Sequence, residues 1–104
     1  MITVQKEHLT RQMDIIPLAA LNTRVTIIGA GAIGSFTAFA LAKMGYNDIH
    51  VFDFDTVSIE NMNAQMFRFS DIGKSKVDSL KEIIKDFADT DITVQNKKYE
   101  NEIF

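Results

Sequence analysis

Six residues, Gly29-Ala30-Gly31-Ala32-Ile33-Gly34, form the pattern G-x-G-x-x-G and constrain the fold more than any other feature. The apolar, β-branched run at 25–28 precedes the pattern, and a stretch rich in alanine and leucine follows it. This order predicts a strand, a tight turn and a helix. Gly29 would allow the turn, Gly31 would let an anion approach the backbone, and Gly34 would let the helix pack on the strand. Free N–H groups at the helix start favour a phosphate there.

The rest of the chain alternates strand and helix patterns. Residues 32–44 lack proline and stop at a glycine, which predicts a helix, and the apolar residues of 76–87 recur at spacings of three, four and seven, which predicts an amphipathic helix. Residues 49–52 and 92–95 are rich in β-branched residues and predict strands. The crossovers are too long for hairpins, so the strands should be parallel. The prediction is an α/β, Rossmann-like βαβαβ unit, half of a doubly wound sheet, with a long connection at 56–75.

At 104 residues the chain has room for one domain only. We expect an N-terminal helical segment over 1–23 and an incomplete Rossmann-like nucleotide-binding domain over 24–104. The first strand would have an unpaired inner edge, so we expect either a truncated piece of a longer protein or an obligate oligomer.

Composition excludes several kinds of partner and site. The net charge is −3 and no Lys/Arg run exceeds two residues, so nucleic acid is not an expected partner. No apolar stretch is long enough to span a bilayer, so no membrane is expected and a cytoplasmic location is the default. With no cysteine, the chain has no disulfide, cysteine zinc site or thioester-forming nucleophile. His8 and His50 lack neighbouring ligands, so no protein-held metal site is predicted.

An acidic residue follows the second predicted strand. Asp53 stands 19 residues after Gly34, about where a carboxylate accepts hydrogen bonds from a ribose hydroxyl. The glycine pattern and Asp53 together still leave a nicotinamide, flavin or ATP site open.

Residues 53–76 carry a second motif. Asp53, Asp55, Val57, Asn61 and Gln65 match the pattern D-x-D-x-V-x-x-x-N-[LM]-x-R-Q, and 71–76 match D-x-G-x-x-K. These residues, with the Arg-Gln pair at 11–12, resemble the ubiquitin-activating-like adenylyltransferases of the ThiF/MoeB/HesA type. The resemblance covers about residues 9–95. It implies activation of the C-terminal glycine of a ubiquitin-like or sulfur-carrier protein as an acyl adenylate, with ATP and Mg²⁺ as cofactors.

The resemblance also implies roles for individual residues. The three glycines would underlie the nucleotide phosphates, and Asp53 would bind the ribose, with Asp55 nearby. Asn61 and Lys76 would face the phosphates, where an ammonium and an amide stabilise the charge of acyl transfer. Arg11 would reach the nucleotide of the other subunit of a homodimer, or of a partner subunit. For Gln65, Arg68 and Lys74, a surface or packing role is at least as good an interpretation as a ligand role. Lys97 and Lys98 are interpreted as a pair of solvated side chains.

One position departs from the pattern, because Ala64 stands where the family has arginine. Losing a transition-state cation typically costs several kcal/mol of barrier, so adenylation would be slow unless another group substitutes. Two alternatives therefore stay open beside an active adenylyltransferase. One is an NAD(P)- or FAD-binding oxidoreductase domain, which leaves 55–76 unexplained. The other is a non-catalytic subunit that dimerises with an active partner.

Overall fold

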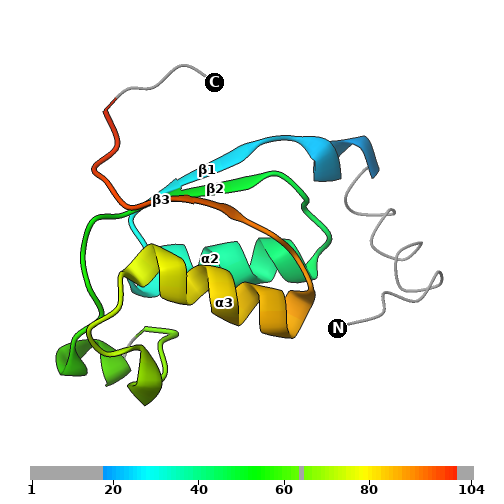
Figure 1. Ribbon diagram of the computed structural model, residues 1–104. Helices are drawn as coiled ribbons and strands as arrows, with labels where there is room; N and C mark the ends of the chain where they lie inside the picture. The colour runs from blue at the N-terminus through cyan, green and yellow to red at the C-terminus, as the bar shows by residue number, and fades with distance from the viewer. Residues whose placement is uncertain (1–17, 64, 101–104) are drawn as a thin grey trace.

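The computed structural model describes residues 18–63 and 65–100. Within these residues three strands and two α-helices alternate, and three short 3₁₀ helices accompany them (Figure 1). In chain order the elements are η1 (Leu18–Asn22), β1 (Val25–Ile28), α2 (Ala32–Lys43), β2 (Ile49–Phe52), η2 (Ile59–Asn63), η3 (Phe69–Asp71), α3 (Lys76–Ala88) and β3 (Thr93–Gln95).

The two α-helices begin and end where local chemistry predicts. At the end of α2, Gly45 has φ +102°, a backbone conformation that glycine adopts without steric cost. At the start of α3, the Ser75 side chain accepts a hydrogen bond from the Asp78 N–H, and at its end Asp89 is left-handed with φ +50°. Three of the four helix termini are thus fixed by one or two residues, and the sequence located both helices to within a residue.

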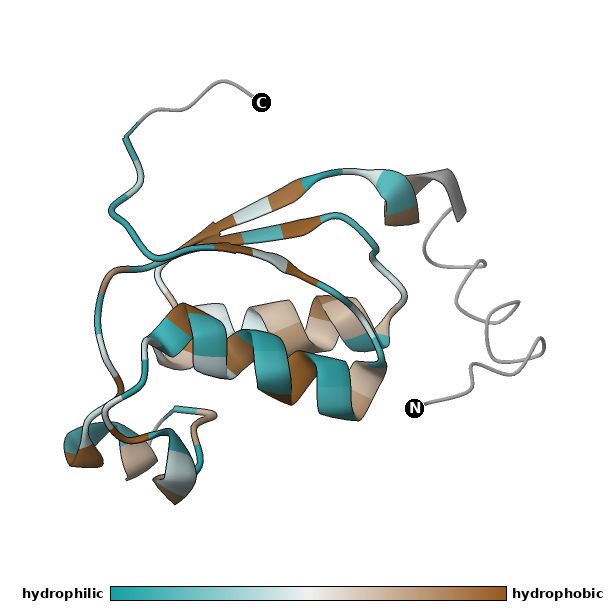
Figure 2. Ribbon diagram, viewed as in Figure 1, coloured by the Kyte–Doolittle hydropathy of each residue, from teal (hydrophilic) through white to brown (hydrophobic). Residues whose placement is uncertain are grey.

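The sheet has the order β1-β2-β3 with all strands parallel. Ile27 lies opposite Val51, and Val51 lies opposite Val94. Their side chains form one row across the sheet, on the face that the helices cover. Both α-helices lie on the same face of the sheet (Figure 1). The apolar side of α3 turns toward the sheet and its charged side faces away (Figure 2), and Leu80 and Ile84 are fully buried. The predicted βαβαβ arrangement is confirmed.

Only small details of the predicted elements change. The third strand begins at Thr93 rather than Ile92, because its pairing with β2 starts at His50 opposite Thr93. The connection at 56–75 contains η2 and η3, which the sequence did not reveal. Of the predicted segment 1–23, residues 1–17 lie outside the described residues, so that segment and the boundary at 24 stay predictions.

Among the described residues, no helix is long and apolar enough to cross a membrane. Within the same residues β1 pairs with β2 alone and forms an edge of the sheet.

Candidate functional site

The glycine turn joins β1 to α2 at the carboxyl edge of the sheet. Gly29 has φ +98°, and its N–H donates to the Phe52 carbonyl at 2.7 Å, which anchors the turn to β2. Gly31 is the N-cap of α2, and a Cβ there would meet nothing within 4 Å. Among the described residues no side chain caps this helix start. An uncapped helix start leaves its first N–H groups as donors for a bound anion.

Gly34 has a different task from the other two glycines. A Cβ built on it would overlap the Gly29 carbonyl oxygen and press on the Ile27 side chain. The third glycine therefore lets α2 start directly against the turn and β1, as the sequence predicts.

Asp53 connects the turn to the chain that leaves β2. One carboxylate oxygen accepts a hydrogen bond from the Ala30 N–H at 2.6 Å, and the other accepts from the Asp55 N–H at 2.7 Å. Each carboxylate oxygen has two lone pairs, so both retain room for a further donor. The carboxylate is thus held rigidly beside the glycine turn.

Asp55 and Lys76 are brought together although 21 positions separate them. The chain after β2 and the chain before α3 form a short antiparallel contact, with a bridge between Thr56 and Ser75. In this contact the Lys76 N–H donates to the Asp55 carbonyl at 3.0 Å. Their side chains also approach, with 3.9 Å between Lys76 Nζ and an Asp55 carboxylate oxygen. Glycine turn, Asp53, Asp55 and Lys76 therefore form one continuous chain of contacts.

Lys76 stands in a position that helix stability alone disfavours. It is the first residue of α3, where the positive end of the helix dipole repels a cation. It is also only 7% exposed, and burial of an ammonium group costs free energy unless it is paired. The Asp55 carboxylate, 3.9 Å from Nζ, offsets part of these costs. A further anion beside Lys76 would offset more of them, so Lys76 is a candidate ligand for a phosphate.

Asn61 lies in η2, in the long connection. Its side-chain oxygen accepts hydrogen bonds from the Ser58 N–H at 2.9 Å and the Ser58 hydroxyl at 3.2 Å. In the described part of the chain its side chain makes no hydrogen bond to the glycine turn, Asp53, Asp55 or Lys76. The oxygen is thus used to shape the connection, while the amide N–H groups remain as the donors that Asn61 offers a ligand.

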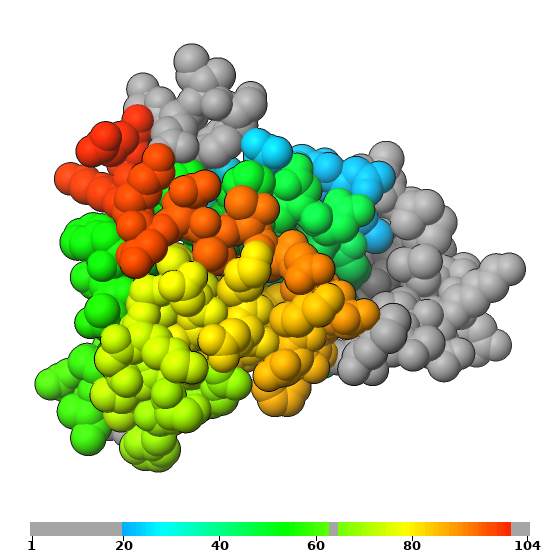
Figure 3. All heavy atoms as spheres, in the orientation of Figure 1, coloured from blue at the N-terminus to red at the C-terminus, as the bar shows by residue number. Residues whose placement is uncertain are grey.

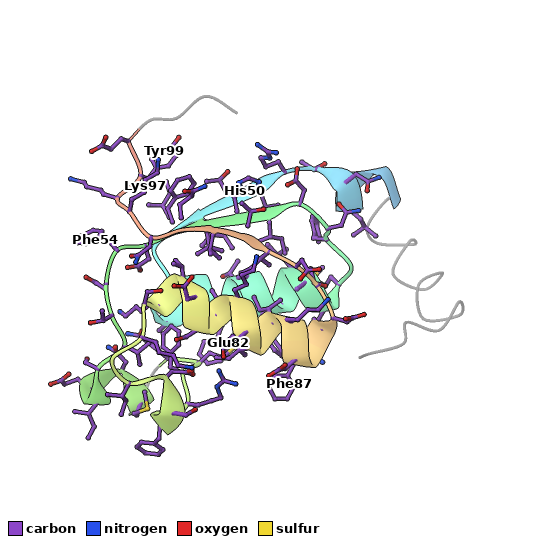
Figure 4. All side chains as sticks on the ribbon, in the orientation of Figure 1. His50, Phe54, Glu82, Phe87, Lys97 and Tyr99 are labelled. Carbon is purple, nitrogen blue, oxygen red and sulfur yellow. The ribbon has the colours of Figure 1, made fainter. Side chains whose placement is uncertain are left out.

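A hollow of about 150 Å³ opens beside the glycine turn, lined by residues 28–29, 52–55 and 97–99. Phe54, Lys97 and Tyr99 lie together at this edge of the sheet (Figure 4). In the space-filling view the end of the described chain, in red, borders the green segment that follows β2 (Figure 3). Sequence reasoning missed Lys97 and Lys98 as candidate site residues. Their position directly after the third parallel strand was the available signal, because ligands bind at the carboxyl ends of such strands.

Arg68 lies outside this group of residues. Its guanidinium donates to the Asp71 carboxylate from Nε at 2.9 Å and from Nη2 at 2.8 Å, and it also contacts Glu82 and Asp86 on α3. Lys74 pairs with Asp71 and Glu82 as well. These residues attach the connection to α3, and the structural interpretation of Arg68 and Lys74 fits their contacts.

Two positions named from the sequence, Arg11 and Ala64, lie outside the described residues. Neighbouring Gln65 is described, and its side-chain oxygen is buried with no hydrogen-bond partner among the described residues.

Comparison with known proteins decides which family this arrangement represents. A family model described as the ThiF family matches residues 9–102. The chain belongs to the ThiF family.

The NEDD8-activating enzyme E1 catalytic subunit of Drosophila melanogaster is 44% identical over 74 residues, 70% of this chain and 16% of that protein. The tRNA threonylcarbamoyladenosine dehydratase of Bacillus subtilis (strain 168) is 42% identical over 66 residues, 62% of this chain and 26% of that protein. This ThiF chain therefore spans about a sixth to a quarter of the length of these relatives.

Solved structures of the same kind share the fold. The E. coli tRNA N6-threonylcarbamoyladenosine dehydratase TcdA in complex with ATP has a TM-score of 0.75 and 23% identity, covering 93% of this chain and 44% of that one. E. coli MccB with AMPCPP has a TM-score of 0.72 and 23% identity, covering 90% and 26%. These similarities confirm the Rossmann-like fold of the ThiF chain.

Proposed function

We propose that this chain carries the ATP-binding domain of an adenylyltransferase that activates the C-terminus of a ubiquitin-like or sulfur-carrier protein. The observation that carries the proposal is the continuous chain of contacts from the glycine turn through Asp53 and Asp55 to Lys76. A turn for an oxidoreductase cofactor would need the glycines and Asp53 alone. The further link to Lys76 adds a fixed ammonium group, which suits charge developing on a phosphoryl group.

In the proposed complex the phosphates of ATP lie at the open start of α2, beside Gly31, and the ribose hydroxyls donate to Asp53. The carboxylate of the carrier protein attacks the α-phosphorus, the acyl–oxygen–phosphorus bond forms, and pyrophosphate leaves. Negative charge grows on the phosphoryl oxygens during this step. Lys76 and the amide of Asn61 would stabilise it, which is what makes them the proposed catalytic residues. The ATP bound to the structural neighbour TcdA supports this choice of nucleotide.

Mg²⁺ is proposed as the metal that accompanies ATP. The described residues contain no cluster of three or more His, Asp or Glu side chains able to hold a metal by themselves. Mg²⁺ is commonly held by one or two carboxylates together with substrate phosphates, so the single carboxylate of Asp55, which is 61% exposed, fits this kind of site. The ion would neutralise phosphate charge.

A second subunit is proposed as well, either another copy of the chain or a related partner that supplies Arg11 in trans. Helix α2 is apolar on nearly every side, yet Ile33 is 84% exposed and Phe36 is half exposed. Helices of this composition are normally buried, which supports a covering subunit. Sedimentation velocity of the purified chain would test this, with a dimer mass expected and a monomer at all concentrations contradicting a homodimer. The cytoplasmic location stays a prediction from the sequence.

The first test is calorimetric titration of the purified chain with ATP and Mg²⁺, repeated with NAD. We expect ATP to bind and NAD not to bind. Lys76→Gln should weaken ATP binding by about tenfold, because it removes one charge-assisted contact. The control is Lys81→Gln, since Lys81 donates to the Ile92 carbonyl on the side of α3 away from the turn.

The outcomes separate the three functional hypotheses. Binding of NAD in place of ATP would contradict the adenylyltransferase assignment and favour an oxidoreductase domain. Binding of ATP followed by pyrophosphate exchange in the presence of a carrier protein would show catalysis. Binding of ATP without any exchange, with or without a partner subunit, would favour the non-catalytic subunit.

A further inference from the structure

The connection between β2 and α3 is closed at its base by two backbone hydrogen bonds. The Gly73 N–H donates to the Val57 carbonyl, and the Val57 N–H donates to the Lys74 carbonyl, both at 2.8 Å. Val57 is 2% exposed, so this base belongs to the core. The helices η2 and η3 of the connection lie below the start of α3, away from the sheet (Figure 1). The two ends of the connection therefore meet directly before Lys76.

Asp71 fixes the turn that leads into this base. Its side chain is fully buried and accepts hydrogen bonds from the backbone N–H, Nε and Nη2 of Arg68. Its backbone takes part as well, because the Asp71 N–H donates to the Arg68 carbonyl at 2.8 Å and its carbonyl accepts from the Lys74 N–H at 2.9 Å. Gly73 follows with φ +92°, a left-handed conformation that favours glycine. One buried residue thus determines the path of the chain over 68–74.

Arg68 extends the same arrangement to α3. Its guanidinium lies 3.3 Å from a carboxylate oxygen of Glu82 and 3.6 Å from one of Asp86. These acids stand on the helix that Lys76 begins. The turn and the helix are therefore held to each other on both sides of the segment that enters α3.

The position of the Lys76 ammonium group depends on this backbone. Its Nζ lies 3.9 Å from the Asp55 carboxylate, which is longer than a hydrogen bond. The closer contact is made by the backbone, where the Lys76 N–H donates to the Asp55 carbonyl at 3.0 Å. A shift of the chain before α3 would therefore move the ammonium group relative to the glycine turn.

We propose that Asp71, through its buried pair with Arg68, is a positioning residue for the nucleotide site and holds the start of α3 so that the Lys76 ammonium faces the phosphates. This rests on the proposed ATP-binding function and adds to it two side chains that do not line the hollow beside the glycine turn. A buried ion pair costs desolvation free energy, and in some proteins it selects one arrangement of the chain rather than adding stability.

The test is a double-mutant cycle on ATP affinity, measured by calorimetric titration of the purified chain with ATP and Mg²⁺. We expect Asp71→Asn alone to weaken ATP binding by about fivefold, because Lys76 loses its fixed position. In the Lys76→Gln background the same change should cost less than about twofold, since no ammonium group is left to position. Adenosine has no phosphate, so its affinity should be the same for the unaltered chain and for Asp71→Asn.

A second variant tests the pair if Asp71→Asn does not fold. Arg68→Lys keeps the positive charge but loses the planar fork that reaches the carboxylate through two nitrogens. We expect about threefold weaker ATP binding, and again almost no effect in the Lys76→Gln background. The control is Ile49→Val, which lowers stability at a buried position at the amino end of β2. Its ATP affinity should stay within about twofold of the original.

The outcomes separate the inference from the function on which it rests. Losses of ATP affinity that are equal with and without Lys76 would show that Asp71 does not act through that residue and would overturn the proposal. An equal loss in Ile49→Val would assign the effect to stability and overturn it too. Unchanged ATP affinity in Asp71→Asn or, where that variant does not fold, in Arg68→Lys would overturn it while leaving the proposed function intact. Failure of the unaltered chain to bind ATP would overturn both.

Discussion

Gly34→Ala should lower the free energy of unfolding by about 3 kcal/mol. Alanine normally stabilises a helix interior by about 1 kcal/mol relative to glycine, so a loss here has the opposite sign from helix propensity. The reason is steric, because the new Cβ would overlap the Gly29 carbonyl oxygen. This oxygen belongs to the backbone, and the hydrogen bond from the Gly29 N–H to the Phe52 carbonyl holds that part of the backbone in place. Urea denaturation followed by circular dichroism measures the change.

Gly31→Ala is the matched control, because it makes the same substitution three residues earlier. Gly31 has φ −75°, which any residue adopts, and a Cβ there has no neighbour within 4 Å. We expect a loss of only about 0.5 kcal/mol of stability, since alanine is a slightly poorer N-cap. ATP affinity should fall, because the methyl group would occupy the space before the first N–H groups of α2. Similar losses of stability at both glycines would contradict the packing role of Gly34.

Asp71→Asn should lower the free energy of unfolding by about 2 kcal/mol at neutral pH. The Asp71 side chain is fully buried and accepts hydrogen bonds from the backbone N–H, Nε and Nη2 of Arg68, all within 2.9 Å. The variant replaces an ionised acceptor by an amide and leaves Arg68 without its main partner. Because Arg68 is 37% exposed, water can solvate its guanidinium in the variant. The expected loss of stability is therefore smaller than for a fully buried ion pair.

The effect of Asp71 should also depend on pH. Burial raises the pKa of Asp71, but the hydrogen bonds and charge of Arg68 outweigh it and hold the pKa below its ordinary value. A carboxyl with a lowered pKa in the folded state stabilises the fold above the unfolded pKa of about 3.9. That contribution disappears as the pH falls through the folded pKa. The difference between the original chain and Asp71→Asn should therefore narrow steadily below about pH 4.

The control for this experiment is Glu82→Gln, which removes a second partner of Arg68. Glu82 is 54% exposed, so we expect a change within about 0.5 kcal/mol. A cost at Glu82 as large as that at Asp71 would mean that the whole charge cluster, rather than the buried carboxylate, attaches the connection to α3.

Several features of this protein follow from the sequence alone because short stretches of chain determine them. The glycine turn depends on residues within six positions of one another, and Gly29 and Gly34 have the conformations and contacts that their spacing predicts. Helix α3 depends on an apolar repeat and on Ser75 at its start. Parallel pairing follows because each crossover is too long for a hairpin. The resemblance to the ThiF-type adenylyltransferases likewise rests mainly on a motif within 24 consecutive residues, from Asp53 to Lys76.

Only the tertiary structure decided which distant side chains meet. The sequence placed Asp55 and Lys76 in the same motif, but their contact needs the antiparallel bridge between Thr56 and Ser75. The sequence did not predict a partner for Arg68. In the folded protein, Arg68 contacts Asp71 and two acidic residues of α3, Glu82 and Asp86. From the sequence, Lys97 and Lys98 are interpreted as a solvated pair. In the structure they follow β3 and line the hollow beside the glycine turn. Periodicity describes each segment's own conformation, whereas these contacts arise from packing between segments that are far apart in the chain.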